Sequence, residues 1–299
     1  MNTQSLGARF NKLPFFVKLP IKIALRPLYY VKYFTNDLLS FLGIRRRGTN
    51  ILFITGFPKS GTTWVENFVT NIPGYNLREL SGEKEVISRH NMPDDAFKWF
   101  PKSGCSSIKT HINPNKANLS ILKNANVKKI LVMYRDPRDI VVSHYYHVLK
   151  HNPWKETDKF YLNYKNVTKL EGLSHSLDMV VESFSPWVNG WFDLAKTTKD
   201  IDFYFLSYEE LRNNQEGTFA NIMKFFEVSL TDIEMKNILK TISKHPKDFN
   251  PERGKYGYKS TFRRGEIGNW EWEFEVDENL KLKANKELSQ ILIRLGYSV

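Results

Sequence analysis

A short buried run followed by a glycine-rich loop is the clearest chemical signal in the sequence. Residues 51–55 predict a strand, and Gly56 and Gly61 then stand at the two glycine positions of a G-x-x-x-x-G loop. Glycine at these positions lets backbone N–H groups close around an anion. Thr62 and Thr63 begin a predicted helix, whose N–H groups and dipole attract negative charge. The segment therefore predicts a phosphate-binding loop between a strand and a helix.

The position of the lysine separates this loop from that of a magnesium-dependent ATPase. In such an ATPase, a lysine follows the second glycine and the next Ser or Thr holds magnesium. Here Thr62 takes the lysine position, and the lysine lies inside the loop as Lys59. A lysine at this place can reach a phosphate oxygen as it gains charge, so the loop requires no metal ion. Trp64, near the start of the helix, either stacks on a base or belongs to the core.

A second strand leads into a second group of anion-binding side chains. Residues 129–134 predict a strand, Pro137 suits the first turn of a helix, and Asp136 suits the cap of that helix. Arg135 is left at the carboxyl end of the strand, where ligands gather in parallel sheets. Ser143 follows two helical turns later, so the guanidinium and the hydroxyl can converge on one phosphate. Taken alone, an arginine after a strand is more often part of a surface ion pair.

A third basic segment lies near the C-terminus, where Arg263 and Arg264 precede Gly265. Paired arginines beside a glycine suit an anion clamp, and a solvated surface loop is the alternative. Read together, the three segments resemble the cofactor motifs of the cytosolic sulfotransferase family, which uses 3′-phosphoadenosine 5′-phosphosulfate (PAPS). The matching segments are Pro58-Lys59-Ser60-Gly61-Thr62-Thr63-Trp64, then Arg135 through Ser143, then Arg263-Arg264-Gly265-x-x-Gly268-x-Trp270.

The resemblance implies a role for each cofactor-binding residue. In that family the first motif binds the 5′-phosphosulfate, the second motif and the basic loop bind the 3′-phosphate, and two aromatic residues contact adenine. By position, the 5′-phosphosulfate site comprises Lys59, Ser60, Gly61, Thr62 and Thr63, the 3′-phosphate site comprises Arg135, Ser143, Arg263, Arg264 and Gly265, and the adenine contacts are Trp64 and Tyr208. The family's common dimer motif is not present at 271–279, so the oligomeric state stays unknown.

The family's catalytic base lies in a Lys-Thr-His segment, which here is Lys109-Thr110-His111. These residues end a predicted strand, so His111 is expected to face the same crevice as the phosphate loop. A neutral imidazole with a pKa near 7 suits removal of a proton from an acceptor hydroxyl. The resemblance implies in-line attack of the acceptor on sulfur, with Lys59 and Lys109 stabilising charge on the sulfuryl and leaving-phosphate oxygens.

The elements that position these residues follow the pattern of a doubly wound α/β fold. Predicted strands and helices alternate, as in a single domain with a central parallel sheet flanked by helices and a P-loop-like strand-loop-helix. The predicted strands are 51–55, 106–110, 129–134 and 203–207, and the predicted helices are 62–71, 137–149, 217–226 and 279–295. Residues 74–104 and 151–174 are polar, aromatic-rich and irregular, which suggests substrate-facing loops.

Charge divides the chain into two parts. Of the net charge of +12, residues 1–47 hold +8, because they contain nine basic residues against Asp37 alone. We expect a basic N-terminal helical extension at 1–47 and a sulfotransferase domain at 48–299. The extension either packs on the body with solvated charges or makes peripheral contact with an anionic membrane. A single cysteine, Cys105, and the lack of an apolar run long enough to span a membrane favour a cytoplasmic location.

The predicted activity is transfer of a sulfuryl group from PAPS to a hydroxyl or amine of a small-molecule acceptor, such as a natural product. A carbohydrate or glycolipid acceptor is the alternative, and a P-loop kinase or NTPase is the alternative of another class. The kinase alternative requires a lysine directly after Gly61 and an acidic magnesium ligand. The sequence has Thr62 at that position and no clear acidic ligand. No nucleic-acid partner is expected, because the charge is concentrated in the N-terminal segment. Either a cationic or polycyclic acceptor or ordinary solvated loops would account for Glu83, Glu85, Asp94, Asp95, Phe97, Trp99 and Phe100.

Overall fold

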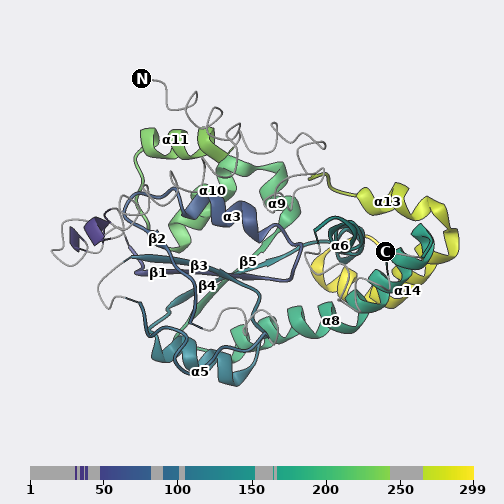
Figure 1. The fold of residues 1–299 in the computed structure, drawn as a ribbon, viewed down its shortest axis with the longest axis horizontal. Helices are drawn as coiled ribbons and strands as arrows, with labels where there is room; N and C mark the ends of the chain where they lie inside the picture. Colours follow the sequence, from purple (N-terminus) through teal and green to yellow (C-terminus); the bar gives the residue numbers. More distant parts are fainter. Residues whose placement is uncertain are drawn as a thin grey trace, which may run out of the picture.

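A five-stranded parallel sheet forms the centre of the protein, in the strand order β2-β3-β1-β4-β5 (Figure 1). The computed structural model describes residues 31, 34–36, 38–39, 48–81, 90–100, 105–151, 164, 167–242 and 265–299. The strands are β1 (Ile51–Gly56), β2 (Asn76–Leu77), β3 (Ser106–Thr110), β4 (Lys129–Tyr134) and β5 (Asp202–Ser207). The α/β fold class predicted from the sequence is confirmed.

Helices cover both faces of this sheet (Figure 1). One face packs against α3 (Thr62–Val69), α9 (Tyr208–Asn213), α10 (Gln215–Phe225) and α11 (Asp232–Ile242). The other face packs against α5 (Lys116–Asn124), α6 (Pro137–His151), α8 (Lys169–Thr197) and α14 (Glu278–Leu295). Before α14, the chain forms the short helices α13 (Asn269–Glu273) and η2 (Phe274–Val276).

Strands β1 and β4 are mostly apolar because each of their faces meets a helical layer. In β1, Phe53 joins the core with α5, α6 and α8, while Leu52 and Ile54 join the core with α3 and α10. All three side chains are fully buried. Strands buried on both faces read as continuous hydrophobic runs in the sequence. Since all five strands are parallel, their carboxyl ends lie along one edge, where the predicted site residues follow.

The four predicted strands and the existence of the four predicted helices are confirmed. The sequence did not predict β2, in which only two residues pair with β3. The prediction of an irregular stretch as far as Ser174 is wrong for residues 169–174, because α8 begins at Lys169. A capping box between Thr168 and Glu171 starts this helix, and its apolar residues then recur at helical spacing on the buried side.

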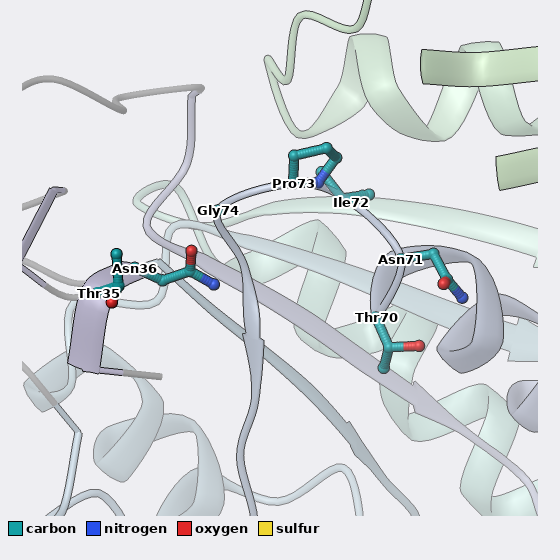
Figure 2. Close-up of a pocket in the computed structure, with 7 residues that line it drawn as sticks. All are labelled: Thr35, Asn36, Thr70, Asn71, Ile72, Pro73 and Gly74. Carbon is teal, nitrogen blue, oxygen red and sulfur yellow. The ribbon is translucent and has the colours of Figure 1, made fainter. Parts of the chain in front are cut away.

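The described part of the N-terminal segment is helical at residues 31, 34–36 and 38–39. Its buried Asn36 donates a hydrogen bond from Nδ2 to Oδ1 of Asn76 in β2, at 2.9 Å. A pocket of about 460 Å³ lies between Thr35, Asn36 and residues 70–74, at the C-terminal end of α3 (Figure 2). The phosphate loop precedes the other end of α3. No helix among the described residues is long and apolar enough to cross a membrane. The division of the chain at residue 47, expected from the charge distribution, stays a prediction.

Candidate active site

The loop between β1 and α3 turns through two residues with left-handed backbone conformation. Lys59 has φ 75° and Gly61 has φ 85°. A non-glycine residue in this region is uncommon and is typical of functional sites. Glycine is required at position 61 for a second reason, because a Cβ there would lie 2.6 Å from Cδ2 of Tyr208. The loop is therefore tightly packed against the start of α9.

Two side-chain donors in this loop lack acceptors among the residues that the structure describes. The Ser60 hydroxyl is buried and has no hydrogen-bond partner among the described residues. Lys59 forms no ion pair with any carboxylate in the described part of the chain. Burial, and then the charges of Arg135 and Lys109, lower the pKa of Lys59 to about 8. Because buried polar groups are normally bonded, these donors fit an anion such as a phosphate or sulfate ester.

His111 lies beside this loop because of the strand register. Thr110 pairs with Thr55, so His111 follows β3 at the level where Gly56 ends β1. Nδ1 of His111 lies 2.6 Å from the Gly56 carbonyl oxygen. A carbonyl oxygen can only accept, so Nδ1 carries the hydrogen, and Nε2 of the neutral ring is left as an acceptor. That tautomer suits a base that takes its proton at Nε2.

The pKa of His111 differs from the value near 7 expected from the sequence. Burial, together with the charges of Lys109, His90 and Lys59, lowers it to about 4, against the raising effect of the bond to Gly56. Desolvation and nearby positive charges both disfavour the imidazolium. His111 is therefore neutral at physiological pH in the protein without a bound anion. A bound polyanion would raise this pKa.

Lys109 extends from β3 toward α3, where its Nζ lies 3.6 Å from Oε2 of Glu66. Burial raises the pKa of Glu66, while the Lys109 charge acts to lower it. Lys109 also lowers the pKa of both Lys59 and His111. The three predicted catalytic side chains thus lie close enough to affect one another electrostatically.

The second anion site is organised around Arg135, at the end of β4. Nη2 of Arg135 donates to Oδ2 of Asp139 at 3.0 Å and to the Glu266 carbonyl at 2.7 Å. Its guanidinium carbon lies 4.2 Å from the centre of the Tyr208 ring. Nε is buried and has no partner among the described residues. Ser143 lies on α6, half-buried, as the sequence predicts.

Asp139 connects the second and third motifs. Its carboxylate accepts hydrogen bonds from the backbone N–H groups of Gly268, at 3.0 Å, and Trp270, at 3.1 Å. The Tyr208 hydroxyl donates to the Gly265 carbonyl at 2.8 Å and holds the start of the same segment. The C-terminal motif therefore reaches the end of β4 as the resemblance implies. Arg263 and Arg264 lie outside the described residues.

The predicted adenine contacts, Trp64 and Tyr208, have ring centres 6.1 Å apart and tilted by 56°. Nε1 of Trp64 is buried without a partner in the described part of the chain. The guanidinium of Arg212 lies 5.7 Å from the centre of the Trp64 ring. These groups offer a stacking surface next to the phosphate loop.

Sequence reasoning missed four residues that shape this site: Glu66, His90, Asp139 and Arg212. Asp139 was detectable, because it follows Arg135 by four residues at the start of a predicted helix. The other three act on residues brought close only by the fold.

A further hydrogen-bonded chain, in which Ser176 Oγ lies 3.0 Å from His144 Nδ1 and 3.2 Å from the Tyr164 hydroxyl, joins α8 to α6. Burial, and then Lys59, lower the pKa of His144 to about 4.

A family model described as "Sulfotransferase domain" matches residues 50–287. The match covers well over half of the sequence, and the chain belongs to the sulfotransferase family. The expected enzyme class, a PAPS-dependent sulfotransferase, is therefore confirmed, and the kinase alternative is not.

Individual relatives agree with this family. The chain is 29% identical to Sulfotransferase 6B1 of Danio rerio over 239 residues, or 77% of this chain and 75% of that protein. It is 23% identical to the amine sulfotransferase of Oryctolagus cuniculus over 257 residues, or 76% of each chain. Mouse sulfotransferase SULT7A1 complexed with PAP has the same fold, with a TM-score of 0.58 and 20% identity over 83% of this chain and 85% of that one. Retinol dehydratase in complex with androsterone and inactive cofactor PAP matches with a TM-score of 0.56 and 16% identity, over 87% and 85%.

Proposed function

We propose that the protein transfers a sulfuryl group from PAPS to a hydroxyl or amine of a small-molecule acceptor. The observation that carries this proposal is the position of His111 beside the phosphate loop. The bond from Nδ1 to Gly56 leaves Nε2 as an acceptor, while Lys59 and Ser60 in the adjacent loop lack acceptors among the described residues. A base and an anion-binding loop thus share one edge of the sheet.

The side chains proposed to hold PAPS carry polar atoms that are not bonded to other described residues. The buried Ser60 hydroxyl, the Arg135 Nε and the Trp64 Nε1 each lack a partner within the described residues. Ser60 follows β1 and is assigned to the phosphosulfate, Arg135 follows β4 and is assigned to the 3′-phosphate, and Trp64 in α3 is assigned to adenine. The residues assigned are Lys59, Ser60, Gly61, Thr62 and Thr63 for the phosphosulfate, Arg135, Ser143, Arg263, Arg264 and Gly265 for the 3′-phosphate, and Trp64, Tyr208 and Arg212 for adenine.

The chemistry divides among three side chains. PAPS supplies an activated sulfuryl group with a phosphate as its leaving group. His111 takes the acceptor's proton at Nε2, and its bond to Gly56 keeps the ring in the required tautomer. Lys59 and Lys109 place positive charge where negative charge develops, and Glu66 orients Lys109. The negative charge of PAPS raises the low pKa of His111 toward the operating pH, where general-base catalysis is most effective.

Metal independence is part of the proposal, because Lys59 occupies the loop and Thr62 stands where a magnesium-dependent ATPase has lysine. Turnover measured in excess EDTA tests it. We expect the same rate as in added magnesium, and a rate lost in EDTA and restored by magnesium would contradict it.

The acceptor is proposed to be a small aromatic, polycyclic or amine-containing molecule. Phe97 and Phe100 pack against each other with ring centres 4.9 Å apart, while Trp99 keeps 73% of its surface exposed. Of the four acidic residues named from the sequence, Glu83 and Glu85 lie outside the described residues. Asp95 is paired with Lys98, so Asp94 is assigned as the acidic partner for a cationic acceptor. The complex of retinol dehydratase, a protein of similar fold, with androsterone supports a polycyclic acceptor. A labelled-sulfate transfer screen over phenols, sterols, amines and sugars tests this choice, with carbohydrates as the alternative outcome.

His111→Ala is the variant that tests the function. Turnover should fall by about two to four orders of magnitude, because general-base catalysis contributes that much. Binding of the product nucleotide, 3′-phosphoadenosine 5′-phosphate (PAP), measured by calorimetry, should remain. His175→Ala is the matched control, because His175 is exposed on α8. Near-normal turnover of His111→Ala would remove His111 from the role of base.

We also propose that the N-terminal segment contacts an anionic membrane. Val31, Phe34 and Leu38 are 58%, 68% and 42% exposed, and their spacing places them on one helical face. The net charge of +8 in residues 1–47, from nine basic residues and Asp37, supplies the matching charge. Replacing the three apolar residues with serine should weaken co-sedimentation with phosphatidylserine vesicles and leave binding to neutral vesicles unchanged. Equal binding of both proteins to the anionic vesicles would refute the contact. The cytoplasmic location stays a prediction.

A further inference from the structure

The backbone that carries His111 is held by side chains from outside β3. Nδ1 of His90 lies 2.7 Å from the His111 carbonyl oxygen, so His90 donates this hydrogen bond. The next carbonyl, that of Ile112, accepts from Nε1 of Trp187 at 3.0 Å. Two consecutive peptide groups after the end of β3 are therefore fixed by specific side-chain donors.

His90 is itself tightly held. Its carbonyl oxygen accepts from the Asn113 backbone N–H at 2.7 Å and from Nδ2 of Asn118 at 3.1 Å. Asn118 is buried, and its Oδ1 accepts from the Met92 backbone N–H at 2.8 Å. Residues 90–92 are therefore hydrogen-bonded both to the segment that follows β3 and to the start of α5.

The backbone at His90 lies in the left-handed region, with φ 54°, which residues other than glycine adopt uncommonly. Such strain persists where surrounding contacts determine the conformation, and it clusters at functional sites. Here the conformation lets one residue bond in two directions, with its carbonyl toward Asn113 and Asn118 and its imidazole toward His111. A surface turn alone would not require the imidazole.

We infer that His90 is a positioning residue for the base. By fixing the His111 carbonyl, His90 sets the orientation of the peptide from which the His111 imidazole reaches Gly56, and so directs Nε2 toward the acceptor. This inference rests on the proposed function of His111. It assigns His90 no contact with PAPS or with the acceptor.

Two substitutions separate the hydrogen bond from the backbone conformation. His90→Gly accepts a positive φ without strain but removes the donor, whereas His90→Asn tolerates a positive φ and keeps a side-chain N–H donor. We expect kcat of His90→Gly to fall about 10- to 100-fold, because a displacement of about 1 Å at a reacting group costs about that much. His90→Asn should recover most of the loss. PAP affinity should change less than about twofold in both variants, because His90 does not touch the anion sites.

Imidazole nitrogen NMR without PAPS gives a second readout. In the wild type, His111 should appear as one tautomer with the hydrogen on Nδ1, and His90→Gly should shift it to a mixture, with His90→Asn close to the wild type. Wild-type kcat and a single tautomer in His90→Gly would overturn the inference. So would equal losses in His90→Gly and His90→Asn. If His111→Ala itself keeps its turnover, the proposed function fails instead, so the two failures are distinguishable.

Discussion

The two anion sites lie on the same edge of the sheet but are built in opposite ways. In the first, the Ser60 hydroxyl has no partner and Lys59 pairs with no carboxylate, within the part of the chain described. In the second, Nη2 of Arg135 is already bonded to Asp139 and to the Glu266 carbonyl, while its buried Nε lacks a partner there. The charge of Lys59 is therefore unbalanced without a ligand, whereas the charge of Arg135 is already balanced by Asp139.

This difference separates binding energy from folding energy. An unpaired buried cation lowers the stability of the free protein, and binding of an anion restores that stability. A paired cation contributes to the fold, because here it links β4 and α6 to a segment more than a hundred residues away. We therefore expect variants of the second site to lose stability and variants of the first to lose rate.

The largest effect is expected for Asp139→Ala. This change leaves Arg135 buried with its ion partner missing and removes the acceptor for two backbone N–H groups. Removal of one partner of a buried pair costs about 3–5 kcal/mol. Urea unfolding measures the loss. Asp193→Ala is the control, because its pairing with Arg294 is at the surface and at 3.9 Å, which predicts a loss of at most about 1 kcal/mol. Equal stability of the two variants would contradict the account of the second site.

Lys59→Met should have the opposite effect, a loss of rate without a loss of stability. Methionine keeps much of the length of the side chain but removes the charge at the reacting oxygens. We expect kcat/KM for PAPS to fall about 10²- to 10³-fold, in the range seen for loss of one donor to a developing charge. The melting temperature should stay equal or rise, because a buried unpaired cation is removed. Lys98→Met is the control at an exposed lysine. A large drop in stability with a normal rate would reverse the comparison.

The sequence predicted the parts of the site that are local in the chain. The strand, loop and helix around Gly56 and Gly61 form one continuous segment, and so do β4, Arg135 and the start of α6. In both segments residue type and spacing determine the local structure. The α/β class followed from the same alternation of strands and helices.

The parts that depend on distant contacts could not be predicted in the same way. The pKa of His111 is set by burial, by the bond to Gly56 and by the charges of Lys109, His90 and Lys59, and of these residues only Lys109 is near it in the sequence. The start of α8 was missed because its first turns contain glycine and polar residues, while the apolar face that packs on α6 becomes apparent only over its full length. The bonds from Asp139 to Gly268 and Trp270 likewise need the fold.

The smallest effect is expected in the pH dependence of PAP binding, and it distinguishes the two sites directly. The pKa of Lys59 is about 8 in the free protein, and a bound anion raises it. Above about pH 8 the free protein must therefore take up a proton to bind PAP, so affinity should fall by up to about tenfold, or 1.4 kcal/mol, per pH unit until the pKa of the complex is reached. Below about pH 8 Lys59 is already charged and contributes no slope.

The phosphates of PAP are fully ionised above about pH 7.5, since their second pKa is about 6. Calorimetric titrations from about pH 7 to 9.5 should therefore show a slope in the wild type that is lost in Lys59→Met. Proton uptake, measured in buffers of different ionisation enthalpy, should vanish with it. A slope that survives in Lys59→Met would place the titrating group outside the phosphate loop, and the contrast between the unbalanced charge of Lys59 and the balanced charge of Arg135 would then lose its electrostatic basis.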